Sequence, residues 1–365
     1  MTAVTTPSQA VDAADAQPFV ARVKEYAEAV LWPAALQTDR AGVTARQVSQ
    51  LAELGLLNHT GPVELGGAAV GRAADRRIHE LIAGACFNTW LVWAQHAPAV
   101  GRLALSYASG TELSDLSREV LAGRLLLGAA ISDVRRFPHS FIDAVRTGDG
   151  WTFSGTVSWV SGWGLNAALM VAAVEAATET VVTALVPIDH RVRAVHLELG
   201  AVNGSRTERV VIDDVYVPDT EVVSTQPLAQ WRTEDLAVAG DARPHHFGLA
   251  ARVLSELDGT GRSDGHRVSD VWRPRVDDLR ARAYALADEA GAADDPRHRI
   301  AERIGIKVAV GESLSLLTRA LLVARSGRGL TLDDTAQLHA RSALFLLVQG
   351  QSADVRDAQL AQLAR

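Results

Sequence analysis

The spacing of apolar residues changes twice along the chain and divides it into three regions. Apolar residues recur at helical intervals from 19 to 124 and again from 226 to 365, so both segments are predicted to be helical domains. Between them, from 125 to 225, the period falls to two, which predicts a β domain. Residues 1–18 are small and polar without such a pattern, and we expect a disordered lead-in there.

The middle region contains short strand-like runs that follow one another closely. The turn at 147–150 separates two of them and is typical of a hairpin. Because no helical pattern lies between the runs, an antiparallel barrel or sandwich is favoured over a parallel sheet. Helices, strands and helices in this order predict an α+β protein. The strand-like runs are 151–155, 157–161, 168–175, 180–187 and 208–217.

Composition and charge narrow the classes of partner. The 365 residues include 36 Lys and Arg against 43 Asp and Glu, a net charge of −7, which argues against nucleic acid or an anionic membrane surface as the main partner. No apolar run approaches the roughly 18 residues that span a bilayer. The start of the chain lacks the apolar segment of a secretory signal, so we expect a cytoplasmic protein.

Motifs for several common chemistries are missing. The single cysteine, Cys86, excludes a disulfide framework and a multi-cysteine metal site, and the 11 histidines form no metal-binding pattern, so no metal is predicted. The sequence has no P-loop and no nucleophile elbow. Residues 162–167 match a loose dinucleotide fingerprint, but strand-like runs flank them on both sides, so they do not indicate a nicotinamide site.

Several local motifs, in a consistent order, resemble the acyl-CoA dehydrogenase superfamily of flavoenzymes. The resemblance covers about residues 20–360 and implies an N-terminal helical domain, a middle antiparallel β-barrel and a C-terminal four-helix bundle. It also implies a flavin between barrel and bundle, and a homotetramer. The segments similar to family motifs are Leu51–Leu56 with Pro62–Gly67, Gly148–Ser161, Leu199–Pro218, Gly327–Leu330 and Arg341–Phe345.

The resemblance points to particular flavin contacts. In the family, a Trp and a Thr of the β hairpin touch the flavin, and the matching residues here are Trp159 and Ser161, with Val160 between them. A wide aromatic ring can cover the flavin, and the Ser161 hydroxyl can stabilise charge on it, so Ser161 is also predicted to act in catalysis. A second flavin strip of the family corresponds to Ile131 and Ser132. A core aromatic is the alternative interpretation of Trp159.

The family's catalytic carboxylate has no counterpart in this chain. Many members use a Glu near the C-terminus to remove a proton from an acyl thioester, but Gln349 or Gly350 occupies that place, and an amide cannot take the proton. Other members carry the Glu on the first helix of the C-terminal domain. Near His245 we find no clean carboxylate, and the nearest is Glu234. The family's sequence element that binds the adenosine end of FAD is also missing around residues 261–272.

A chain that keeps the family's flavin-contacting residues but lacks its catalytic carboxylate resembles the two-component monooxygenases of the superfamily. These enzymes receive reduced flavin from a separate reductase and oxygenate small substrates. In some of them a His on a long N-terminal helix lies near the flavin, and His96 holds the comparable place, so we predict that it is catalytic. A buried, hydrogen-bonded structural histidine is the alternative. The predicted substrate pocket consists of Trp93, Arg135, Arg136, His245 and Gln349.

Three functions therefore compete. The leading one is a monooxygenase that uses O₂ and reduced FAD or FMN on a small or carrier-bound biosynthetic substrate. The reduced flavin would then be a co-substrate. It would work with a flavin reductase and assemble as a homotetramer, without nucleic acid or membrane. The second is an acyl-thioester α,β-dehydrogenase with a relocated base. The third is a flavin-poor binding or non-redox descendant. The arginines of the 131–140 loop either bind an anionic substrate group or lie in solvent.

Overall fold

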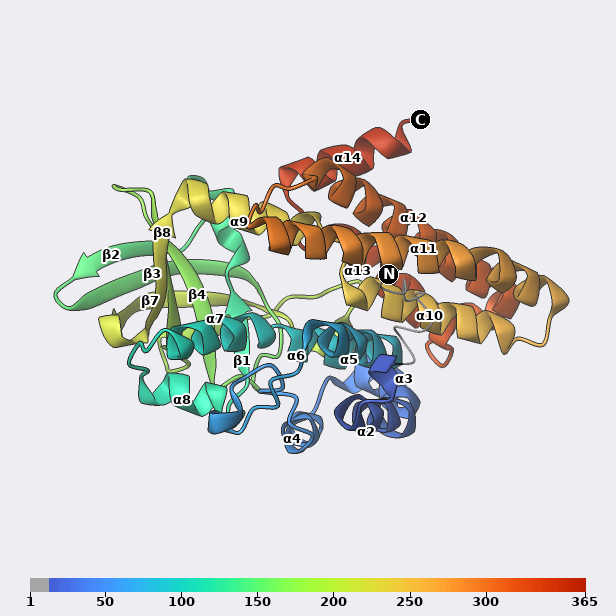
Figure 1. The fold of residues 1–365 in the computed structure, drawn as a ribbon, viewed down its shortest axis with the longest axis horizontal. Helices are drawn as coiled ribbons and strands as arrows, with labels where there is room; N and C mark the ends of the chain where they lie inside the picture. Colours follow the sequence, from blue (N-terminus) through green and yellow to red (C-terminus); the bar gives the residue numbers. More distant parts are fainter. Residues whose placement is uncertain (1–12) are drawn as a thin grey trace, which may run out of the picture.

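The computed structural model describes residues 13–365, and its helices and strands follow the predicted order (Figure 1). The chain has an acyl-CoA dehydrogenase-like fold, with N-terminal helices, a middle sheet and C-terminal helices, which confirms the predicted fold class. Among the described residues, no helix is both long and apolar enough to cross a membrane.

The expected lead-in is ordered in its last part. Residues 1–12 lie outside the described residues, but Ala13–Asp15 are helical and Ala14 is buried. The carboxylate of Asp15 accepts hydrogen bonds from Arg77 Nε at 2.6 Å and Lys24 Nζ at 2.7 Å. These two cations come from helices that fold against the segment, which is why the sequence of the lead-in alone did not predict its order.

A capping motif marks the start of α4 among the N-terminal helices. Thr44 is the N-cap of α4 and forms a reciprocal capping box with Gln47, which satisfies two backbone donors of the first turn. The elements of this region are α2 (Pro18–Tyr26), η1 (Ala27–Leu31), α3 (Trp32–Ala41), α4 (Ala45–Glu53), η2 (Val63–Leu65), α5 (Arg72–Ala85), α6 (Phe87–Ala94), α7 (Ala97–Ala108) and α8 (Asp115–Leu121).

The middle region is one eight-stranded sheet with the order β6-β7-β3-β2-β4-β5-β8, and β1 pairs with β4. The predicted hairpin joins β2 to β3. The sheet is mixed, however, and not purely antiparallel, because β4 runs parallel to both β1 and β2. The strands are β1 (Leu127–Ala130), β2 (Asp143–Thr147), β3 (Gly150–Val160), β4 (Ala168–Glu175), β5 (Thr180–Pro187), β6 (Val192–Val195), β7 (Glu208–Pro218) and β8 (Val222–Pro227), with short turns η3 (Ser132–Arg136), η4 (Asn203–Ser205) and η5 (Asp219–Glu221).

The C-terminal region is helical to its end. Helices α10 to α13 pack against one another as a bundle, while α9 crosses from the sheet to the bundle and α14 extends from it (Figure 1). The elements are α9 (Leu228–Gly240), α10 (Pro244–Asp258), α11 (Ser263–Ala293), α12 (Ile300–Arg325), η6 (Ser326–Leu330), α13 (Thr335–Val348) and α14 (Ala353–Leu363).

The hydrophobic core joins the two helical regions. Buried residues of α2 to α6 form one continuous cluster with those of α10 to α13. The sheet encloses a separate cluster between its own strands. Helices α7 and α8 cover the face built by β1, β4 and β5. The N-terminal helices therefore pack partly on the bundle and partly on the sheet, and they connect the two.

Helices α5 and α10 cross at a pair of glycines. A Cβ on Gly248 would lie 2.2 Å from the carbonyl oxygen of Glu80, and a Cβ on Gly84 would lie 2.7 Å from that of Gly248. Arg252 reinforces the crossing, because its Nε donates to the Gly84 carbonyl at 3.0 Å. Since the obstacles are backbone atoms of packed helices, a side chain at either glycine would force the helices apart.

We predict that Gly248→Ala destabilises the protein by about 2–3 kcal/mol or more, because the added methyl group overpacks the crossing. The measurement is the free energy of unfolding in urea. The matched control is Gly305→Ala on α12, where a Cβ meets nothing within 4 Å. That change is expected to be neutral or to stabilise by up to about 1 kcal/mol. Equal effects of the two substitutions would contradict the close crossing.

Candidate active site

A buried carboxylate brings the two predicted flavin strips together. Asp133, in η3, is 2% exposed, and its oxygens accept hydrogen bonds from Ser158 N–H at 2.9 Å and Ser158 Oγ–H at 2.6 Å. Ile131 and Ser132 therefore lie beside the end of β3, next to Trp159. Arg136 Nη1 lies 3.5 Å from Asp133 Oδ1 as well, so the carboxylate links η3 to the end of β3.

Trp159 is the exposed end of a row of otherwise buried aromatic side chains, here called the aromatic surface, that runs from the sheet to the bundle. Of the 8 tryptophans, it is the one with an exposed ring, at 39%. Its ring centroid lies 6.2 Å from that of Phe345 on α13, and Phe345 lies 6.0 Å from Phe87 on α6. Phe87 contacts Trp90 at 4.9 Å, and Trp90 stacks on His245 of α10 at 4.0 Å. Trp159 and His245, far apart in sequence, are thus ends of one surface.

Two polar side chains at this surface have no hydrogen-bond partner. The Nε2 atom of His245 and the Oε1 atom of Gln349 are buried and unpaired among the described residues. Burial, with the neighbouring charges of His246 and Arg243, lowers the pKa of His245 well below its ordinary value, so the ring is neutral. Unpaired buried polar atoms are costly, so these two atoms are available to hydrogen-bond a ligand.

Lys307 of α12 holds the end of α13 against α9. Its ammonium is 5% exposed and donates to the Ala239 carbonyl at 2.6 Å and to the Gln349 carbonyl at 3.3 Å. Both acceptors lie at helix C-termini, where the helix dipole favours a cation. Burial, with the charges of Arg135 and Arg243, lowers the pKa of Lys307 to about 8. The lysine thus fixes the backbone of Gln349 at the pocket.

His96 has a structural position in this fold. Its ring is 1% exposed; Nε2–H donates to the Leu57 carbonyl at 2.6 Å, and Nδ1 accepts from Leu127 N–H at 3.1 Å. Burial lowers its pKa to about 4. Because main-chain groups bond both ring nitrogens, the geometry favours the structural alternative for His96 over the catalytic one. The imidazole at the aromatic surface is His245.

The other predicted pocket residues divide into two groups. Trp93 is fully buried, and its Nε1 donates to the Leu56 carbonyl at 2.8 Å, so it belongs to the core and not to the pocket as predicted. Arg135 forms a bidentate ion pair with Asp235 of α9, in which its Nε and Nη2 atoms donate to the two carboxylate oxygens at 2.6 and 2.7 Å. Arg136 is exposed and donates to Ser158 Oγ at 2.6 Å, beside Trp159. Arg136 therefore has the freer guanidinium of the two.

The nearby carboxylates do not face the aromatic surface. Glu234 of α9 accepts from Gln230 at 2.9 Å and lies with the C-terminal end of α11. Glu256 is the buried carboxylate of α10, and it accepts from His339 at 2.6 Å, Arg325 at 3.0 Å and Thr335. It lies 11 residues beyond His245, about 16 Å along the helix. Neither is placed to replace the family's base.

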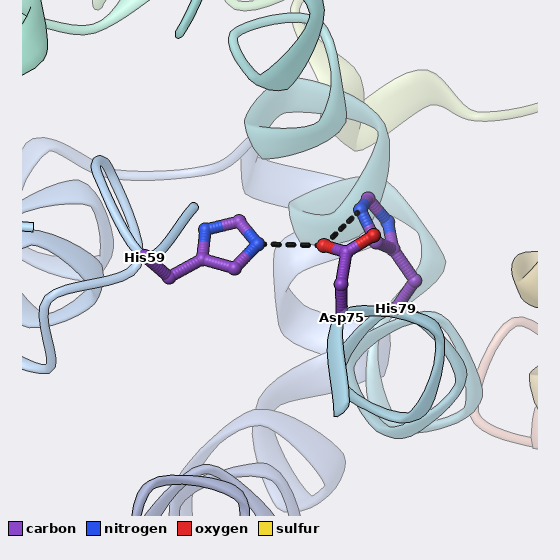
Figure 2. Close-up of side chains that lie close together, drawn as sticks. All are labelled: His59, Asp75 and His79. Atoms are coloured by element: carbon purple, nitrogen blue, oxygen red, sulfur yellow. Dashed lines mark hydrogen bonds and ion pairs between the residues drawn. The ribbon is translucent and has the colours of Figure 1, made fainter. Parts of the chain in front are cut away.

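A cluster of two imidazoles and a carboxylate lies next to Trp90 of the aromatic surface. Figure 2 shows His59 and His79 on either side of Asp75, whose Oδ1 lies 2.7 Å from His59 Nε2 and 3.6 Å from His79 Nε2. Trp90 Nε1–H donates to His79 Nδ1 at 3.0 Å, which leaves the ring proton on Nε2. A metal ion between the three would need a lone pair on that nitrogen. The cluster therefore suits hydrogen bonding and not a metal.

The residues at the surface fit a flavin. An exposed tryptophan, a buried serine hydroxyl at Ser161 and an unpaired amide oxygen at Gln349 match a flat ring with polar edges. Sequence reasoning missed Phe345, Phe87, Trp90 and Lys307. Phe345 ends the motif that resembles the family's C-terminal element, which was an available signal, whereas Phe87 and Trp90 look like ordinary core residues of an apolar helix.

Comparisons with known proteins show what the sequence and the fold of this chain are similar to. Residues 13–113 match the family described as acyl-CoA dehydrogenase, N-terminal domain. The human mitochondrial short-chain specific acyl-CoA dehydrogenase is 23% identical over 349 residues, which cover 88% of this chain and 82% of the human protein. The identity is too low to carry over a substrate.

Solved structures with the same fold include a nitrososynthase and a protein with bound FAD. A nitrososynthase from Micromonospora carbonacea var. africana superposes with a TM-score of 0.76 at 20% identity and covers 99% of this chain and 98% of its own. The FAD complex of PigA superposes with a TM-score of 0.77 at 12% identity and covers 100% and 99%. At these identities the structures show the fold of this chain and leave its reaction open.

We predict that Lys307 makes stability rise with pH. Its pKa is about 8 when folded and 10.5 in its ordinary state, so between these values the unfolded chain binds more protons and rising pH favours the folded state. Relative to Lys307→Met, the wild type should gain up to about 1.4 kcal/mol per pH unit in that window. Urea unfolding of both proteins from pH 7 to 9.5 measures this. A constant difference would contradict the lowered pKa.

Proposed function

We propose that this member of the acyl-CoA dehydrogenase superfamily is a flavoprotein that uses reduced flavin and O₂ to oxygenate a small or carrier-bound substrate. The match of residues 13–113 to the family's N-terminal domain and the shared fold support membership of the superfamily, whose members are flavin-dependent oxidoreductases. Reduced flavin supplies two electrons, with which one oxygen atom enters the substrate and the other leaves as water. FAD is the flavin we propose, because the fold's PigA relative is known with FAD bound.

The observation that carries this proposal is the amide at the place of the base. Gln349 cannot remove a carbon-bound proton, and its carboxamide oxygen is buried without a partner. A dehydrogenase would need a carboxylate close to the aromatic surface. Glu234 and Glu256 have other partners and other places, which favours the oxygenase over the alternative with a relocated base.

The residues of the surface take separate roles in the proposed reaction. Trp159 covers one face of the flavin ring, and Ser161 donates a hydrogen bond to its polar edge. His245, neutral and with a free Nε2, orients a polar group of the substrate, and the free oxygen of Gln349 accepts from an N–H or O–H of the substrate. Arg136, exposed beside Trp159, would bind an anionic part of a carrier.

The proposal includes partners. A monooxygenase of this kind needs a separate reductase to supply reduced flavin, and the missing adenosine anchor suits a flavin that arrives as a co-substrate. We also propose a homotetramer. Each of three C-terminal helices, α12, α13 and α14, carries exposed apolar side chains, and such residues are common where a surface is covered in an oligomer. They are Val323, Leu344, Val348, Leu360 and Leu363.

We predict that Trp159→Ala lowers the affinity for FAD about tenfold, because it removes the ring that stacks on the flavin. Fluorescence titration measures the affinity. The matched control is Tyr216→Ala, an exposed aromatic on β7 that pairs with the opposite end of β3 at Thr152. The control should bind as the wild type does. Equal losses in the two variants would contradict the assigned flavin face.

We predict that the wild type does not act as a dehydrogenase. Anaerobic addition of butyryl-CoA should leave the absorbance of bound oxidised FAD unchanged, since an amide, Gln349, stands at the place of the family's base. Bound reduced FAD should be reoxidised when air is admitted. Stopped-flow absorbance follows both reactions.

Gln349→Glu is the control for the butyryl-CoA experiment. If this variant bleaches FAD and the wild type does not, the pocket accepts acyl thioesters and lacks only the base. Bleaching by the wild type, with no reaction of its reduced flavin with O₂, would establish the dehydrogenase, and Glu234 would be the first carboxylate to replace. A protein that binds neither form of flavin would support the flavin-poor alternative.

A further inference from the structure

Three buried hydroxyls follow one another behind the end of β3. Ser161 Oγ lies 2.8 Å from Thr207 Oγ1, and Thr207 Oγ1 lies 2.7 Å from Ser205 Oγ. The side chains are 7%, 4% and 0% exposed, in that order. None of the three hydroxyls has another side-chain hydrogen bond among the described residues. The chain therefore has three hydroxyl protons and two internal bonds, so one proton is left over.

The position of the left-over proton follows from burial. If Ser161 donated to Thr207 and Thr207 to Ser205, the Ser205 proton would have no acceptor in a fully buried place. If both serines donated to Thr207, the Thr207 proton would be stranded in the same way. An unmade hydrogen bond of this kind costs about 1–3 kcal/mol. The remaining arrangement satisfies both inner hydroxyls: Ser205 donates to Thr207, and Thr207 donates to Ser161.

This arrangement leaves the Ser161 proton as the free donor. Ser161 follows β3 two residues after the exposed Trp159, and Val160 between them is fully buried in the sheet. The local backbone is fixed as well, because Gly162 N–H donates to the Ser205 carbonyl at 2.8 Å and Asn166 Nδ2 donates to the Ser161 carbonyl at 2.9 Å. Donors in a chain polarise one another, so the free donor at its end is strengthened.

We propose that Thr207 and Ser205 are positioning residues that force the Ser161 hydroxyl to donate outward, to a carbonyl or ring-nitrogen acceptor of the flavin. The inference rests on the proposed flavin site and adds the direction of the hydrogen bond and the residues that set it. A donor at the polar edge of the ring favours the reduced flavin, which carries more negative charge than the oxidised form. Thr207 thereby acts on the flavin through Ser161 without touching it.

The test compares Thr207→Val, Thr207→Ser and Ser205→Ala in the full-length protein. Affinities for oxidised and reduced FAD and the two-electron reduction potential of the bound flavin are measured for each variant. Thr207→Val is expected to weaken binding of reduced FAD about three- to tenfold more than binding of oxidised FAD. A tenfold difference lowers the potential by about 30 mV. Ser205→Ala should shift the potential in the same direction, and Thr207→Ser should restore it.

The double variant with Ser161→Ala separates positioning from a structural effect. If Thr207 acts through Ser161, adding Thr207→Val to Ser161→Ala changes the potential no further. Thr183→Val is the matched control, an equally buried threonine on β5, and should leave the potential unchanged. Additive shifts, or a Thr207→Val protein with wild-type affinities and potential, would overturn the inference alone. A wild type that binds neither form of FAD would overturn the proposed function and the inference with it.

Discussion

The site depends on the close crossing of α5 and α10. Gly84 and Gly248 let the two backbones meet where any Cβ would collide with a carbonyl oxygen. Because α6 follows α5 after a single residue, the crossing also decides where Phe87 and Trp90 lie. His245, one helical turn before Gly248, is then stacked on Trp90. One backbone contact thus joins two helical regions into one core and builds half of the aromatic surface.

The other half of the surface depends on polar contacts at the sheet. Asp133 attaches η3 to β3, and Lys307 attaches the end of α13 to the end of α9. Both groups are buried, and each is satisfied by main-chain partners or a hydroxyl. Their fixed geometry places Trp159 opposite Phe345 and leaves Gln349 at the rim. A carboxylate and an ammonium are used here to hold segments together, not to transfer protons.

Hydrogen-bond partners distinguish His245, the imidazole of the proposed site, from His79 and His96. Burial lowers the pKa of His79 and His96 to about 4 and that of His245 well below the ordinary value, so burial and charge state do not separate them. Partners do. Both nitrogens of His96 are used by the main chain, and Nδ1 of His79 is used by Trp90, whereas Nε2 of His245 has no partner. An unpaired nitrogen in a wall of aromatic rings is what a ligand site requires.

The sequence by itself determined the order of helices, strands and helices, because the period of apolar residues is encoded locally. Its local motifs also pointed to the strips that carry Trp159, Ser161 and Ser132. It also showed that Gln349 stands where a carboxylate was expected. Tertiary structure decided the rest. Whether His96 or His245 faces the pocket depends on main-chain partners 31 to 39 residues away in sequence. The parallel pairing of β4 with β1, the order of Ala13–Asp15 and the exposure of Trp159 beside Phe345 likewise arise from contacts between distant segments, which no local pattern records.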